Sequence, residues 1–284
     1  MAKMINDGLG IGQPQPDQPF LDTTAYGSGP DDGLSDATEN AAITHHVAIV
    51  NGISIPYTAT AGHLVTVDPS SSKPAAKFFY VAFTADGMDA TTRPVTFFYN
   101  GGPGSSSVFL LLGSFAPRRI RTSMPGFTPP PPYAMEDNPD SLIDRSDLVY
   151  INPVGTGYSA AIAPFKNRDF WGVDQDAVSI KQFIKRYLAY DGRVTGIDTG
   201  IAAIVSPDGG MNDPTMVAVG GVYTTMWNSY LNNDLKFTAT SNFVDLNDQA
   251  FQFWDFSHTD PTGAVQKPDR QALCRSTTLR CAVI

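Results

Sequence analysis

Long apolar runs are missing from this sequence of 284 residues. No window approaches the roughly 18 consecutive apolar residues that a membrane-spanning helix needs. The first twenty residues, MAKMINDGLGIGQPQPDQPF, also lack the apolar segment of a secretory signal. We therefore predict neither a membrane span nor a signal peptide.

Charged residues are few, at 17%, and acidic residues outnumber basic ones, which gives a formal net charge of −9. Such a surface repels nucleic-acid phosphates and anionic membranes, so neither is an expected partner. Cysteine is limited to Cys274 and Cys281, which do not define a redox compartment. The length and 42% hydrophobic content predict a soluble globular protein that acts on small molecules or peptides.

The character of the sequence changes near residue 40. Residues 1–40 are rich in Gly, Pro, Asp, Gln and Ser without a period, which predicts a flexible N-terminal tail. Beyond it, β-branched runs predict antiparallel strands, with Asn51 and Gly52 in a type I′ hairpin turn. We expect the folded domain to cover residues 41–270. The C-terminal tail, residues 271–284, matches neither a helix nor a core strand.

Two short apolar strands are predicted to end in glycine-rich turns. The first, RPVTFFYN at 93–100, runs into Asn-Gly-Gly-Pro-Gly, and the second, DLVYINP at 147–153, runs into Val-Gly-Thr-Gly. Apolar residues at helical spacing predict a helix over 173–188, and the Asp-Pro pair at 213–214 predicts the start of another. Ligands of open α/β sheets bind at the C-terminal ends of strands, so both turns are candidate site elements.

The loop at 100–104 has two interpretations. It is not a phosphate loop, because no Lys-Ser/Thr follows it and its spacing is not G-x-G-x-x-G. Its backbone N–H groups could form an anion nest that suits a carboxylate or the oxyanion of acyl transfer. The alternative is a tight turn that simply requires glycine.

Three blocks carry a resemblance to a known family. They are NGGPGSSS, DNPDSLIDRSDLVYINPVGTGYS and DPTMVAVGGVYTTMWNSYLNNDLKF. Together they resemble the serine carboxypeptidase family of α/β-hydrolases over about residues 44–270, and most closely its bacterial branch, which has serine after Gly-Pro-Gly. The resemblance implies an α/β fold: an incomplete α/β-hydrolase domain whose mixed sheet starts with antiparallel strands and is flanked by helices.

The resemblance also implies roles for single residues. Asn100 and the Gly101 amide would hold the C-terminal carboxylate of a peptide or protein substrate, and the Gly102 amide would be an oxyanion-hole donor. The same cleft would be lined by Pro153, Val154 and Gly155. The loop is followed by Ser105, Ser106 and Ser107. These serines would begin a helix and cap its free amides rather than attack the substrate. No cofactor and no metal site are predicted.

The catalytic triad of the family is not identifiable. No serine has glycine at both flanking second positions, as G-x-S-x-G requires, and the family's Gly-Glu-Ser-Tyr is also absent. The implied acid and histidine belong beyond the FSHTDPTG segment. His258 could pair with Asp255 or Asp260, or it could cap a turn. The other histidines are expected in early strands, remote from the cleft: His45, His46 and His63.

Two functional hypotheses therefore stand. In one, the chain is a serine carboxypeptidase that removes C-terminal residues from peptides. In the other, it is a non-catalytic fragment or pseudo-enzyme that at most binds peptide C-termini. Without nucleophile, base and acid, we expect no measurable peptidase activity from this chain. Missing sheet strands would leave open edges that favour self-association. The family is mostly exported or found in acidic compartments, and the sequence itself indicates no compartment.

Overall fold

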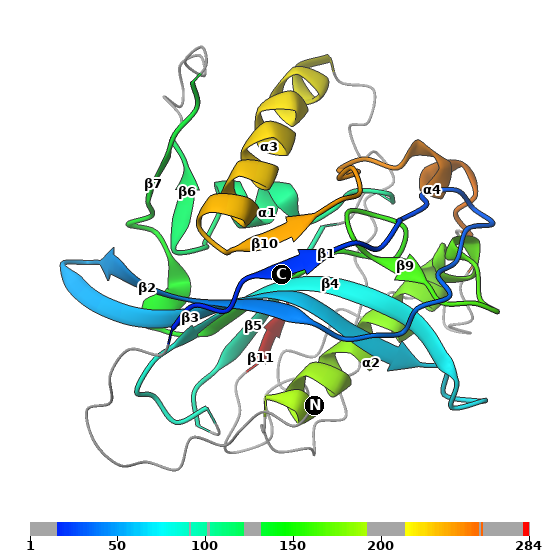
Figure 1. The fold of residues 1–284 in the computed structure, drawn as a ribbon, viewed down its shortest axis with the longest axis horizontal. Helices are drawn as coiled ribbons and strands as arrows, with labels where there is room; N and C mark the ends of the chain where they lie inside the picture. The colour runs from blue at the N-terminus through cyan, green and yellow to red at the C-terminus, as the bar shows by residue number, and fades with distance from the viewer. Residues whose placement is uncertain are drawn as a thin grey trace.

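A mixed β-sheet of seven strands forms the centre of the computed structural model (Figure 1). The structure describes residues 16–90, 92–100, 103–121, 132–191, 214–255, 257 and 281–283; of residues 214–221 and 281–283 it describes the backbone only. Along the sheet the strands follow the order β11 (Cys281–Val283), β5 (Val95–Tyr99), β8 (Asp147–Ile151), β4 (Pro74–Ala85), β3 (Ile53–Val67) and β2 (Ala41–Val50), with β9 (Ala160–Ala161) attached to β4.

The sheet begins with an antiparallel meander, as predicted. It consists of β2 (Ala41–Val50), β3 (Ile53–Val67) and β4 (Pro74–Ala85). Asn51 and Gly52 connect the first two strands with φ values of 51° and 77°. Both values are positive, as the predicted type I′ turn requires of its two central residues. Turns of this kind match the right-handed twist of the paired strands.

The second half of the sheet is largely parallel. β5 (Val95–Tyr99) lies parallel to β8 (Asp147–Ile151), which in turn pairs antiparallel with β4. The short strand β9 (Ala160–Ala161) continues along β4. On the other side of β5, β11 (Cys281–Val283) adds in parallel, contrary to our expectation that this part of the tail forms no core strand. Residues 271–280 lie outside the described part.

Helices cover both faces of the sheet (Figure 1). α2 (Val173–Tyr190) packs on one face through Ile180, Phe183 and Ile184, which meet the sheet residues Phe78 and Tyr80. This confirms the helix predicted over 173–188. The other face carries α1 (Val108–Gly113) and α3 (Pro214–Asn233), which starts at the predicted proline. The predicted α/β class, with a mixed sheet flanked by helices, is therefore confirmed.

Smaller elements complete the described fold. They are β6 (Arg118–Ile120), β7 (Met135–Asp137), β10 (Phe237–Ala239), α4 (Asp248–Gln252) and the 3₁₀ helices η1 (Leu142–Asp144) and η2 (Asn167–Phe170). β6 and β7 form an antiparallel pair. Among the described helices, none has the length and apolar character that a bilayer crossing requires.

The segment 16–40 differs from the flexible tail that we expected. β1 (Phe20–Asp22) pairs in parallel with β10, and the Leu34 side chain is only 7% exposed. The Tyr26 hydroxyl lies 2.9 Å from Nε2 of the buried His63 in β3, and within the segment it donates to the Asp22 carboxylate at 2.7 Å. These few side chains find buried partners on the domain, which outweighs the polar composition of the segment. We therefore correct the expectation for residues 16–40, and residues 1–15 lie outside the described part.

Candidate functional site

The two predicted turns lie at the same edge of the sheet. Tyr99, the last residue of β5, is paired with Ile151, the last residue of β8. Because the strands are parallel, Asn100 and the turn at 153–155 leave the sheet side by side. The N-terminal end of α2 reaches this edge through Trp171, whose Nε1–H donates to the Val154 carbonyl at 3.1 Å. Gly101 and Gly102 lie outside the described residues.

Ser107 connects the first turn to the end of β8. Its hydroxyl donates to the Ile151 carbonyl and accepts the Asn100 N–H at 3.0 Å. Its own N–H donates to Asn152 Oδ1, also at 3.0 Å. The position of Asn100 relative to β8 is thus fixed by a buried side chain.

The expected helix-capping role of the three serines is only partly correct. Ser107 occupies the N-cap position of α1, but its side chain makes no capping hydrogen bond because the Ile151 carbonyl engages it instead. The Ser106 hydroxyl is fully buried and has no hydrogen-bond partner in the described part of the chain. Ser105 is 8% exposed and bridges to Leu246. Such buried hydroxyls agree with our expectation that these serines are not nucleophiles.

Gly104 is required because the chain's own backbone approaches it. Its φ is +103°, and a Cβ there would collide with the Asn247 carbonyl oxygen. The Asn247 N–H donates to the Gly104 carbonyl at 2.8 Å, and the Ser106 N–H donates to the Asp245 carbonyl at 2.8 Å. A late segment of the chain, residues 245–247, therefore lies against the first turn.

Gly155 is required for a similar reason. At its φ of +84° a Cβ would lie 2.8 Å from Trp171 Nε1. Gly157, two residues on, has a φ of +52° and donates its N–H to the Val244 carbonyl at 2.7 Å. The segment 244–247 thus contacts both glycine-rich turns.

Asn247 is the residue of this site that the sequence analysis missed. Its side-chain amide is buried and donates to the carbonyls of Gly155, at 2.7 Å, and Ser28, at 2.9 Å. Its Oδ1 accepts the N–H groups of Gln249 and Ala250 and so caps α4. An Asn before Asp-Gln-Ala is a recognisable N-cap signal. Only the fold reveals that the same side chain also reaches Gly155.

One ionisable group at this edge was also not foreseen. Asp176 lies in the first turn of α2, and burial raises the pKa of its carboxyl to about 7. Burial, together with the charge of Asp176, raises the pKa of Tyr99 to about 12. The edge that holds Asn100 therefore contains a carboxyl group whose pKa is raised by burial.

Three of the four histidines lie in the described part of the chain, and each contacts a partner outside the turn at 100–104. His63 Nε2 lies 3.1 Å from the Tyr158 carbonyl, which can only accept, so this nitrogen carries the proton. Burial lowers the pKa of His63 to about 4, and the ring stays neutral. His63 is nearer to the second turn than we expected, because Tyr158 follows that turn directly. His45 contacts Asp17 and His46 contacts Thr44. His258 and Asp260 lie outside the described residues.

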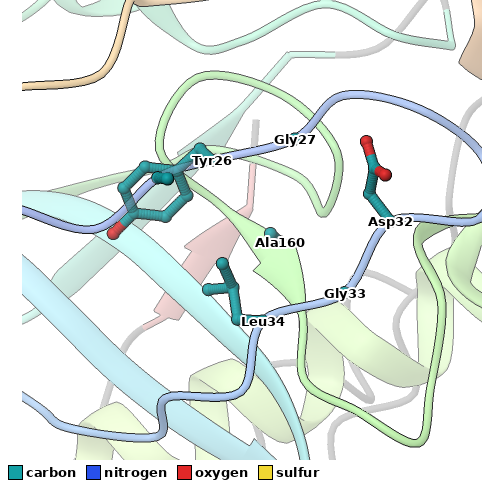
Figure 2. Close-up of a pocket in the computed structure, with 7 residues that line it drawn as sticks. Tyr26, Gly27, Asp32, Gly33, Leu34 and Ala160 are labelled. Atoms are coloured by element: carbon teal, nitrogen blue, oxygen red, sulfur yellow. The ribbon is translucent and has the colours of Figure 1, made fainter.

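A cavity of about 320 Å³ lies beneath the segment that joins β1 to β2 (Figure 2). Leu34 and Ala160 form its apolar floor, and the side chain of Asp32 points away from them. The Asp32 carboxylate accepts the Gly29 N–H at 2.8 Å and so shapes the segment itself. None of the predicted site residues lines this cavity. Within the described residues, no three His, Cys, Asp or Glu side chains gather as metal ligands would.

Both turns lie within one range of residues that matches a known protein family. A family model described as serine carboxypeptidase matches residues 52–201, more than half of the chain. The chain is also 28% identical over 125 residues to "Serine carboxypeptidase-like 36" of Arabidopsis thaliana. That alignment covers 43% of this chain and 24% of the plant protein, so the matched part spans about a quarter of that relative. The chain belongs to the serine carboxypeptidase family.

Proposed function

We propose that this chain carries the part of a serine carboxypeptidase site that receives the C-terminal carboxylate of a peptide. The observation that carries the proposal is the geometry of Asn100 within the matched family region. Its backbone is fixed by Ser107, and its side-chain amide makes no hydrogen bond to another described residue. Amide N–H groups are suitable donors for a carboxylate.

The remaining roles follow from the family resemblance. The Gly101 amide would be a second donor to the peptide carboxylate, and the Gly102 amide would donate to the oxyanion that forms during hydrolysis. Loss of one such oxyanion donor typically lowers kcat about 10²–10³-fold. The cleft would be lined by Pro153, Val154 and Gly155, of which Val154 is held by the indole of Trp171.

We further propose that the chain as given binds peptide C-termini without hydrolysing them. The support is the absence of both G-x-S-x-G and Gly-Glu-Ser-Tyr from the full sequence. Serine after Gly-Pro-Gly supports a place in the bacterial branch, and the missing motif supports a fragment or pseudo-enzyme. For the whole protein, the family match favours the hydrolysis of C-terminal residues.

The far end of β2 supports a second, separate proposal, which is self-association. β2 is the last strand of the sheet, and the segment 17–18 covers its edge at Ile43 and His45. Beyond these residues the Val47 and Ile49 side chains are 59% and 57% exposed. Antiparallel pairing of residues 47–50 in two chains would cover that part of the edge. Sedimentation should then show a dimer that Ile49→Lys converts to a monomer; a monomeric wild-type chain would exclude the interface.

The carboxylate-binding proposal is tested by changing the charge of one amide. Asn100→Asp places a negative charge at the expected carboxylate position and should weaken binding of an N-acetylated dipeptide with a free C-terminus at least about tenfold. Asn232→Asp, at an exposed position of α3, adds the same charge elsewhere and should leave binding unchanged. Equal binding by both variants would contradict the role of Asn100.

Lack of hydrolysis is tested separately with a serine-reactive fluorophosphonate. We expect no labelled serine, and no release of the terminal residue from the same dipeptide. Labelling of a single serine, together with product release, would show that the chain is an active peptidase.

A further inference from the structure

A second cavity, of about 640 Å³, lies away from the two turns. It is bounded by the N-terminal half of α2, by η2, and by the tip of the β3–β4 hairpin. Neither Asn100 nor any of residues 153–155 lines it. Its volume falls within the range of about 300–1,000 Å³ that is usual for small-molecule sites.

Part of the apolar lining of this cavity comes from a face of α2 that does not pack against the sheet. The helix buries Ile180 and Ile184 against the sheet, while Asp174, Val178 and Gln182 form a separate stripe at four-residue spacing that faces the cavity. Val178 is 48% exposed although it is apolar. Exposed apolar surface within a hollow is typical of a binding site.

Two aromatic rings also line the cavity. Phe165 and Phe170 have their ring centroids 6.4 Å apart, at an angle of 67°. Val67, which is 46% exposed, completes the apolar lining at the hairpin tip. An apolar ligand body would therefore contact side chains from three different elements.

The charge around the cavity has one sign. Three carboxylates line it, those of Asp68, Asp169 and Asp174. No Lys, Arg or His is among its described lining residues. Hydrogen bonds from the hydroxyls of Ser70 and Ser71 lower the pKa of Asp68, so this carboxyl is ionised at neutral pH.

The nearest cations of η2 and its flank are engaged elsewhere. Lys166 Nζ pairs with Asp31 at 2.8 Å, and Arg168 pairs with the same carboxylate. Asp169, which lies between these two residues in sequence, accepts the main-chain N–H of Lys166 at 2.9 Å. The charged side chains among the described lining residues are thus carboxylates, which attract positive charge.

We propose that this cavity binds a small organic cation, an amine or guanidinium compound with an apolar body. The body lies against the valines and the two phenylalanines, and the cation lies near the carboxylates. The aromatic faces add to the attraction of the cation. This site is independent of the proposed carboxylate site, because the two share no lining residue.

The proposal is tested with three probes of the same shape. Tryptamine is the cation, tryptophol is its neutral analogue, and indole-3-acetate is the anion. In titrations followed by amide NMR shifts, tryptamine should bind and shift the amides of Val67 and Val178. It should bind at least about threefold more tightly than tryptophol and lose this advantage at high salt, because exposed charges are screened. Equal affinity for the three probes, or shifts elsewhere on the protein, would overturn the proposal.

Matched variants locate the site. Val178→Arg brings a cation into the cavity from an exposed helix position and should lower tryptamine affinity at least about tenfold. Met88→Arg makes a similar change at a residue that is 57% exposed and does not line the cavity, and it should leave affinity unchanged. Unchanged binding by Val178→Arg, or an equal loss in both variants, would also overturn the proposal.

Discussion

The side-chain amide of Asn247 donates a hydrogen bond to the carbonyl of Gly155 at 2.7 Å, across 92 residues of sequence. The main-chain N–H of the same residue donates to the carbonyl of Gly104. One asparagine thus sets the distance between the two turns of the candidate site, and the late segment 244–247 belongs to the site although it lies outside the matched family region.

Replacement of the Asn247 side chain should therefore loosen the turn at Gly155, whereas the main-chain bond to Gly104 remains. Asn247→Ala removes two buried donors and the cap of α4, and we expect a loss of about 2–4 kcal/mol in the free energy of unfolding. Asn247→Asp keeps the capping oxygen but removes the donors to Gly155 and Ser28. Denaturant unfolding of both variants measures the difference. If Asn247→Ala costs less than about 0.5 kcal/mol, the residue does not join the turns.

Gly155 allows a direct test of the contact with Trp171. Gly155→Ala places a Cβ at a residue with positive φ and against the Trp171 indole. Gly87 also has a positive φ, of +70°, but a Cβ at this position would meet open space. In both variants, alanine at a positive φ should lower the free energy of unfolding by about 1–2 kcal/mol. Only Gly155→Ala should lose more than this, because only its Cβ contacts another side chain. Thermal unfolding of the pair isolates the cost of the contact. Equal losses would mean that Trp171 simply moves aside.

The buried pair Arg93 and Asp147 should dominate the stability of the parallel half of the sheet. Arg93 Nε lies 2.7 Å from Asp147 Oδ1, which also accepts the Ala85 N–H at 3.0 Å. Asp147→Asn removes the negative charge from this buried pair and should cost about 3–5 kcal/mol. The exposed carboxylate of Asp31 is the control, because Asp31→Asn should cost at most about 1 kcal/mol. Urea denaturation curves of the two variants would separate these effects, and similar costs would contradict the account.

His63 should make the protein sensitive to mild acid. Burial lowers its pKa to about 4 in the fold, against 6.5 for an unperturbed histidine. Above pH 6.5 both states are neutral and the full stability is present. As the pH falls from 6.5 to 4, only the unfolded state takes up the proton, so up to about 3 kcal/mol is lost.

The variant His63→Gln keeps a donor for the Tyr158 carbonyl but does not titrate. Its free energy of unfolding should change less steeply between pH 6.5 and 4.5 than that of the wild type. The difference in slope should correspond to the uptake of up to one proton on unfolding. Denaturant unfolding across this pH range provides the measurement. Identical slopes would show that His63 is protonated in the fold.

Local patterns predicted the framework of the fold. The hairpin at Asn51 and Gly52, the strands that end at Tyr99 and Ile151, and the helix over α2 all follow from turn chemistry and periodicity within a few residues. Such signals are local, so the sequence alone reveals them. The sheet edge shared by both turns follows from the parallel pairing of the strands.

Long-range partners could not be predicted in the same way. Ser107 has the sequence context of a cap, but the Ile151 carbonyl, 44 residues away, engages its hydroxyl. The segment 16–40 has the composition of a free tail, yet the Tyr26 hydroxyl lies 2.9 Å from Nε2 of the buried His63 in the domain. In both cases a buried partner, which the local sequence does not contain, decides the structure.

The most direct test of the central claim is a calorimetric titration with two forms of one N-acetylated dipeptide. One form has a free C-terminal carboxylate and the other has a C-terminal amide, which removes the charge and keeps the shape. If Asn100 and its turn receive the peptide carboxylate, the free acid should bind at least about tenfold more tightly than the amide. Equal affinity for the two forms would contradict the claim.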